Sequence, residues 1–192
     1  MNHRLPRAFA FALVLAATAV PAPSSAQDAI QTFREPTDGT DVTIGAASGL
    51  VRAPAEEVVG VLSDYANYVE FMPHFKTSRV LGARGSRANV YVEAAILHDS
   101  YTLWAQVTMR VRDGAQPGQK IIEATMTRGN VDRFIVRWEV QPVDATSALV
   151  TFRLLVDPDL PVPDSLVSSE NERWAQRTLG RLRTRVDLVG RT

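Results

Sequence analysis

The sequence predicts an α+β fold, in which one curved antiparallel sheet of about seven strands carries two short helices after its first strand and a long helix at its C-terminus. Three observations support this prediction. Segments between Thr77 and Val156 alternate apolar and polar residues with a period of two, as strands do. Short turns separate these segments, which favours hairpins and an antiparallel meander. After Pro163 the apolar residues instead recur at helical spacing.

The first strand is predicted from Asp41 to Val51, because its apolar residues share one face. Pro54 then fits the first position of a short helix, where its missing N–H is not needed. A second short helix is predicted over Tyr65–Met72. Asp64 is its expected cap, and Pro73 ends it.

The later strands have one apolar and one polar face. The clearest alternation runs from Tyr101 to Arg112, with the apolar residues at every second position. The polar face carries five arginines that are expected to pair across strands with Glu123 and Glu139, namely Arg110, Arg112, Arg133, Arg137 and Arg153.

The last helix is predicted to lay an apolar stripe on the sheet. A strongly curved sheet cannot fill its own concave side, so this helix must cover it, and any remaining space becomes a pocket. The residues expected to line that pocket are large and lie on inward faces. They are Phe71, Met72, Phe75, Tyr101, Leu103, Met109, Phe134, Val136, Trp138, Phe152, Trp174 and Leu182.

Each of these positions also suits simple core packing, which is the alternative interpretation for any one of them. Tyr101 and Trp138 are the residues expected to orient a polar group of a ligand, since each combines an apolar ring with a polar atom.

Residues 1–26 have the layout of a cleavable secretory signal. Arg4 and Arg7 precede an apolar run over 8–20, and small residues, Ser24 and Ala26, occupy the positions before the expected cleavage. The run is shorter than the roughly 20 residues that span a bilayer. The signal predicts a periplasmic or secreted protein, with an uncleaved anchor as the alternative. Residues 27–40 are expected to be a flexible leader, and 41–190 a single domain.

Composition excludes several classes of function. The formal net charge is zero, and removal of the signal's two arginines makes it −2, so nucleic-acid binding is not expected. The chain has no cysteine, which rules out disulfides and thiolate chemistry. His74 and His98 lack neighbouring ligands at metal-binding spacing, so neither a metal site nor a cofactor is predicted. His98 and Asp99 form either an acid/base pair or, as we favour, a solvated turn.

The segments APAEEVVGVLSDYANYVEFMPHFKTSRVLG and DLPVPDSLV resemble the START-like (SRPBCC, helix-grip) superfamily. The similarity is greatest to its polyketide cyclase/dehydrase and coenzyme-Q-binding branch. It is carried by Ala53-Pro54-Ala55, by Asp64-Tyr65 and by Phe71-Met72-Pro73, and extends over about 41–189. The resemblance implies a helix-grip fold with a ligand cavity under the last helix. It implies no single activity, because the superfamily includes lipid carriers, quinone binders and cyclases.

Together these features predict an exported protein that binds or carries a lipid-like or isoprenoid/quinone-like ligand. A cyclase- or dehydratase-like enzyme using the same pocket is the alternative, although the predicted inward faces carry almost no ionisable groups. A cell-envelope interaction module without a ligand is the second alternative. Arginines 173, 177, 181 and 185 either allow transient contact with a membrane surface or form a solvated face. No oligomeric state is predicted.

Overall fold

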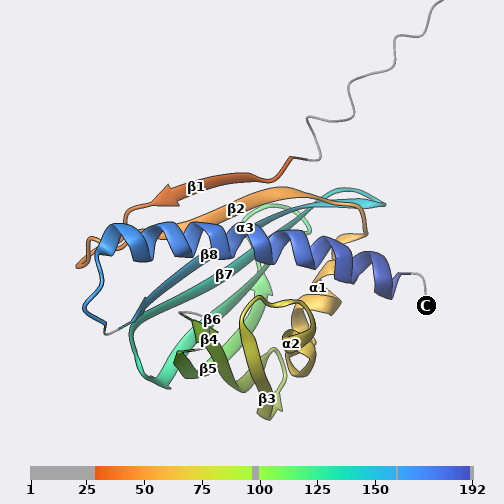
Figure 1. Ribbon diagram of the computed structural model, residues 1–192. Helices are drawn as coiled ribbons and strands as arrows, with labels where there is room; N and C mark the ends of the chain where they lie inside the picture. Colours follow the sequence, from red (N-terminus) through yellow and green to blue (C-terminus); the bar gives the residue numbers. More distant parts are fainter. Residues whose placement is uncertain (1–28, 97–99, 159, 191–192) are drawn as a thin grey trace, which may run out of the picture.

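The computed structural model describes residues 29–96, 100–158 and 160–190. It confirms the predicted α+β class, with one curved antiparallel sheet of eight strands and a long helix α3, Asp164–Val189 (Figure 1). The sheet order is β1-β2-β8-β7-β6-β5-β4-β3. The strands are β1 Gln31–Glu35, β2 Ile44–Val51, β3 Phe75–Arg84, β4 Arg87–Ile96, β5 Tyr101–Asp113, β6 Lys120–Gly129, β7 Val131–Asp144 and β8 Ser147–Pro158.

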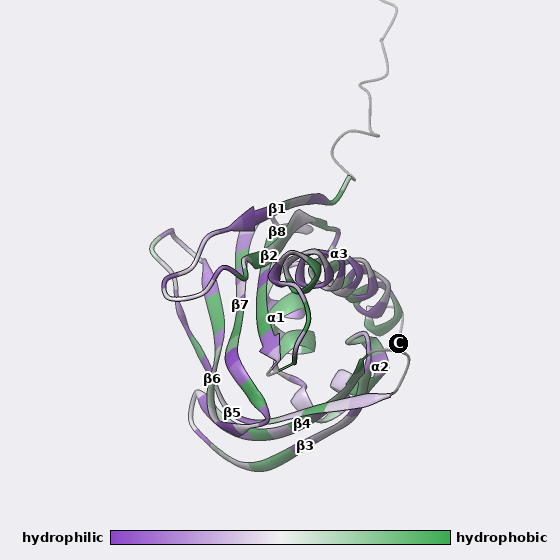
Figure 2. Ribbon diagram, turned by 60° about the vertical axis from the view of Figure 1, so that its left-hand side comes forward, coloured by the Kyte–Doolittle hydropathy of each residue, from purple (hydrophilic) through white to green (hydrophobic). Residues whose placement is uncertain are grey.

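The sheet curls into an open barrel, and α3 lies across its concave side (Figure 2). Helix α1, Ala55–Ser63, lies inside the curve. The second predicted helix is split into a 3₁₀ turn, Tyr65–Asn67, and the short α2, Tyr68–Phe71. Asp64 makes no side-chain cap for this turn; its carboxylate instead accepts a hydrogen bond from the Asn67 amide at 2.8 Å.

The eighth strand, β1, corrects the expectation that residues 27–40 form only a loose leader. β1 pairs antiparallel with β2. Its Arg34 binds Glu172 of α3 at 2.6 Å, and its Glu35 binds Arg153 of β8 at 2.9 Å. Its apolar content is limited to Phe33, so hydrophobic alternation could not reveal it. Backbone pairing and ion pairs to distant elements hold this strand, and sequence periodicity records neither.

A ladder of ion pairs crosses the outer face of the sheet, which confirms the predicted cross-strand pairing for Arg112, Arg137 and Arg153. Arg133 instead donates hydrogen bonds to the carbonyls of Asp38 and Gly39. Glu123 binds both Arg112, at 2.6 Å, and Arg137, at 3.1 Å. Glu139 then binds both Arg137, at 2.8 Å, and Arg153, at 3.2 Å. These pairs are partly exposed, so each contributes little alone, but together they link β5, β6, β7 and β8 on the polar face.

The core fills the concave side of the sheet. Trp138 and Phe152 from adjacent strands are fully buried and stack with ring centroids 3.9 Å apart. Leu179 and Leu182 of α3 are likewise fully buried and belong to the same hydrophobic cluster. This packing confirms that the last helix covers the curved sheet with an apolar stripe. Within the described ranges, no helix combines the length and apolar character needed to cross a bilayer.

Helix α3 lies directly against the backbone of β2 at Gly45. A Cβ atom added to Gly45 would lie 2.2 Å from the backbone of Asn171 and Glu172. The Asn171 side chain, only 2% exposed, accepts a hydrogen bond from the Val156 N–H at 3.2 Å and donates one to the Val156 carbonyl at 3.3 Å. The Thr43 N–H donates to Ser168 at 2.9 Å. The N-terminal half of α3 is thus fixed directly to β2 and β8.

This contact predicts opposite effects for two glycine substitutions. Gly45→Ala should lower the free energy of unfolding by about 1–3 kcal/mol, because the added methyl group meets backbone that can only move as a unit. Gly60→Ala should instead raise it by roughly 0.5–1 kcal/mol, because Gly60 lies in α1 and an added Cβ meets no atom within 4 Å. Urea unfolding measures both changes. A Gly45→Ala protein as stable as the wild type would contradict the close approach.

Candidate functional site

The larger of two neighbouring pockets opens beside the N-terminal half of α3 and has a volume of about 540 Å³. Such a volume lies within the range that small-molecule sites occupy. Its wall combines the ends of β4, β5 and β8, the chain that leads into α3, and one side of α3. The lining residues are His74, Ala95, Ile96, Leu103, Val156, Pro158, Leu160, Val162, Leu166, Val167, Glu170, Asn171, Trp174 and Arg177. We call this space the outer pocket.

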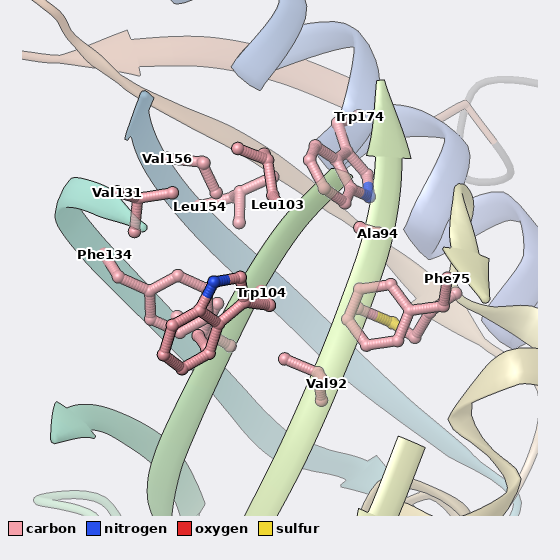
Figure 3. Close-up of a pocket in the computed structure, with 13 residues that line it drawn as sticks. Phe75, Val92, Ala94, Leu103, Trp104, Val131, Phe134, Leu154, Val156 and Trp174 are labelled. Carbon is pink, nitrogen blue, oxygen red and sulfur yellow. The ribbon is translucent and has the colours of Figure 1, made fainter. Parts of the chain in front are cut away.

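The second, inner pocket lies deeper between the sheet and α3, and its volume is only about 30 Å³ (Figure 3). That volume holds one or two water molecules, so the space directly under the helix is nearly filled. All its lining side chains are aliphatic, aromatic or thioether. They are Met72, Phe75, Val92, Ala94, Leu103, Trp104, Ala105, Val131, Phe134, Val136, Leu154, Val156 and Trp174.

Three residues line both pockets and form the boundary between them: Leu103, Val156 and Trp174. Each is at least nine-tenths buried. The Trp174 ring packs edge-on against His74, with centroids 5.4 Å apart, and against Phe75 at 6.5 Å. Movement of a few side chains at this boundary would therefore join the two spaces.

The predicted cavity residues divide into two groups. Met72, Phe75, Leu103, Phe134, Val136 and Trp174 line the inner pocket, and two of them also line the outer one. Phe71, Met109, Trp138, Phe152 and Leu182 are buried in the core and line neither of these pockets, and half-buried Tyr101 packs against that core. An inward-facing position on a strand can belong either to the core or to the wall of a cavity. The alternation of apolar and polar residues identifies such positions but does not distinguish these two roles. Ligand contact by the six pocket-lining residues stays a prediction, whereas Trp138, which was expected to orient a polar group of a ligand, lies in the core and borders neither of these pockets.

Sequence patterns missed the polar residues of the outer pocket. Arg177 and Glu170 lie seven residues, or about two turns, apart on α3 and pair at 3.5 Å, and each is about half exposed. Asn171 also borders the pocket, but its amide is engaged with the backbone of Val156. The signal that could have revealed this charged rim is the i, i+7 spacing of an acid and a base beside the apolar stripe.

His74 enters the outer pocket because of the turn between α2 and β3. Its φ of 68° is the single positive φ outside glycine among the described residues. Histidine is among the residue types enriched in this left-handed region. The His74 carbonyl accepts a hydrogen bond from the Ala95 N–H at 2.9 Å, which fixes the turn to β4. The predicted His98–Asp99 pair lies outside the described residues. Among the described ranges, no three metal-ligating side chains converge.

Helix α2 is held in place by a buried tyrosine. The Tyr68 hydroxyl donates a hydrogen bond to the Leu62 carbonyl at 2.5 Å, and its ring packs edge-on against Phe71. Burial, followed by the nearby Tyr65 and Asp64, raises the pKa of Tyr68 well above the usual tyrosine value. This arrangement positions Met72 and Phe75, which follow α2 and line the inner pocket.

The raised pKa of Tyr68 predicts a loss of stability in alkali. The folded state holds the phenolic proton of Tyr68 more tightly than the unfolded state does. The resulting contribution of Tyr68 to the free energy of unfolding is complete below the unfolded tyrosine pKa of about 10, and it is lost as the pH rises through the higher pKa of the folded state. Tyr68→Phe should cost about 1 kcal/mol at neutral pH and flatten this alkaline decline, as measured by urea unfolding between pH 8 and 11. Tyr91→Phe is the control, because half-buried Tyr91 owes its raised pKa chiefly to a hydrogen bond with Glu93 and only secondarily to burial. An equal flattening in both variants would contradict the assignment.

A family model described as polyketide cyclase / dehydrase and lipid transport matches residues 51–183. A STAR-related lipid transfer protein from Xanthomonas axonopodis is similar in structure, with a TM-score of 0.72, 18% identity, and coverage of 82% of this chain and 93% of that one. Human StAR-related lipid transfer protein 5 has a TM-score of 0.72 at 12% identity, with coverage of 84% and 83%.

A START superfamily protein from Mycobacterium smegmatis has a TM-score of 0.62 at 20% identity, covering 76% of this chain and 98% of that one. At such identities the structural similarity shows the fold alone. None of the curated proteins compared matches the chain. The expected resemblance to the START-like superfamily is confirmed by the family model and the fold together.

Proposed function

Because the chain belongs to the polyketide cyclase / dehydrase and lipid transport family, we propose that it binds or carries a lipid-like or isoprenoid/quinone-like molecule in the outer pocket. The fold is consistent with a hydrophobic ligand. The observation that carries the proposal is the 540 Å³ pocket, whose wall is mostly aliphatic and aromatic. Burial of apolar surface, at roughly 25 cal/mol per Å², would drive binding.

The two ends of the outer pocket suit the two ends of an amphipathic molecule. Leu103, Val156 and Trp174 form its deep end, which suits an apolar chain or ring system. Glu170 and Arg177 are about half exposed, so they offer a polar rim for a head group. Leu166, 46% exposed, also belongs to the rim. An apolar rim residue beside arginines supports brief contact with a membrane surface during loading.

Export to the periplasm or beyond belongs to the same proposal. It is supported by the signal-like pattern of residues 1–26, which lie outside the described residues. A carrier for apolar molecules would have a use there, because such molecules do not cross an aqueous space unaided.

Filling the outer pocket should weaken binding. Ala95 is 5% exposed and lines the outer pocket. In Ala95→Trp the indole would displace about 60 Å² of ligand contact, which at 25 cal/mol per Å² is about 1.5 kcal/mol, or roughly a tenfold loss of affinity. Displacement of the fluorescent probe N-phenyl-1-naphthylamine by lipids and quinones extracted from a bacterial envelope measures this loss. Circular dichroism verifies the fold of each variant.

The matched control is Val143→Trp, which places the same indole at a position that is 58% exposed and borders neither pocket. It should bind as the wild type does. Purified wild-type protein that carries no ligand in native mass spectrometry, and binds none of the extracted molecules, would contradict the proposal. That result would instead favour an interaction module of the cell envelope with a filled interior.

A cyclase- or dehydratase-like enzyme is the second candidate, and the imidazole of His74 in the pocket wall favours it. General acid/base chemistry requires such a group within reach of the substrate. Mass spectrometry of bound molecules from wild-type and His74→Gln proteins separates the two functions. A carrier should yield the same molecules from both. An enzyme should yield a substrate from the variant that is converted, for instance by loss of water, in the wild type.

A further inference from the structure

We propose that Trp174 selects an apolar ligand that carries an uncharged hydrogen-bond acceptor, such as a carbonyl oxygen, at the boundary between the outer and inner pockets. The inference rests on the proposed binding function and specifies the chemistry of the ligand. The indole Nε1–H of Trp174 is buried and has no hydrogen-bond partner among the described residues. The whole residue is 7% exposed.

A buried polar group without a partner is uncommon in folded proteins, because its burial is unfavourable unless something pairs with it. In Figure 3 the indole nitrogen lies on the edge of the ring that is nearest to Ala94 of β4, a residue of the inner pocket. The donor is therefore presented toward the space between helix and sheet. It is not directed into the solvent around α3.

The surroundings favour a ligand oxygen over water as the partner. A buried water molecule requires two to four polar contacts. The side chains that line the inner pocket include no acceptor oxygen, and Trp104 is the other residue among them with a polar side-chain atom. A water molecule bound to Trp174 would therefore remain largely unsatisfied. A single acceptor atom on an apolar framework satisfies the donor and leaves the remaining wall in apolar contact.

The position of Trp174 also defines where the acceptor lies along the ligand. Leu103, Val156 and Trp174 form the boundary, so a molecule that reaches the inner pocket from the outer one passes the indole. Its acceptor would lie at the boundary, with apolar groups on either side. A carboxylate is disfavoured at this depth, because removal of its charge from water is costly without a counter-charge. The charged residues that line the outer pocket, Glu170 and Arg177, already pair with each other near its rim.

The test compares two molecules that differ in one oxygen. The intact mature chain is titrated with 2-pentadecanone and with pentadecane, each displacing N-phenyl-1-naphthylamine. The ketone should bind about tenfold more tightly, since a site that hydrogen-bonds an oxygen discriminates against the analogue without it. Trp174→Phe should reduce the preference to less than twofold by weakening ketone binding, while pentadecane binds nearly as before.

Trp138→Phe is the matched control. The Trp138 Nε1–H is also buried without a partner among the described residues, yet Trp138 lines neither pocket. This variant loses the same N–H and should keep the tenfold preference. The inference is overturned if Trp174→Phe retains the preference, or if Trp138→Phe loses it equally. Equal binding of ketone and alkane by the wild type overturns this inference alone. Failure to bind either molecule, or the probe, overturns the proposed function and the inference with it.

Discussion

The contact between α3 and β2 at Gly45 determines where the helix lies, and the pockets depend on that position. Backbone meets backbone there, with no space for a Cβ atom. The buried amide of Asn171 adds hydrogen bonds to Val156, so one residue of α3 is tied to β8 while its neighbour touches β2. Trp174 follows Asn171 by about one turn. The helix backbone therefore has little freedom here, and any opening at the boundary must come from side chains.

Ion pairs on the outer face of the sheet also help to hold α3 in its position over the concave face. Glu123 and Glu139 each bind two arginines, and Arg153 continues the ladder to Glu35 in β1. β1 in turn binds α3 through Arg34 and Glu172. The ladder and the strand thus connect the polar face to the helix that covers the apolar face. Exposed pairs are individually weak, so their effect is to fix register and orientation more than to supply stability.

The sequence was sufficient to predict the fold class, the helix over the curved sheet and the ion pairs of the outer face, because periodicity and charge position encode them directly. It could not separate Trp138 from Trp174. Both lie on inward faces, yet one stacks on Phe152 and the other borders both pockets. Whether an inward-facing residue borders a cavity depends on the distance between the helix and the sheet at that point. A local sequence pattern does not contain this distance. β1 and the left-handed His74 were missed for the same reason: partners distant in sequence define them.

The different volumes of the two pockets limit the shape of a ligand that could bind there. The space directly beneath α3 is nearly filled, whereas the outer pocket, beside its N-terminal half, is much larger. A bulky ligand would therefore lie mainly in the outer pocket and extend only a narrow group past Trp174. Deeper entry requires side chains at this boundary to move, and rotation of the indole would change its edge-on contacts with His74 and Phe75. A longer apolar chain would gain contact in the inner pocket but would weaken the contacts of the Trp174 ring with His74 and Phe75. The length of the ligand and the position of the Trp174 ring would therefore depend on each other.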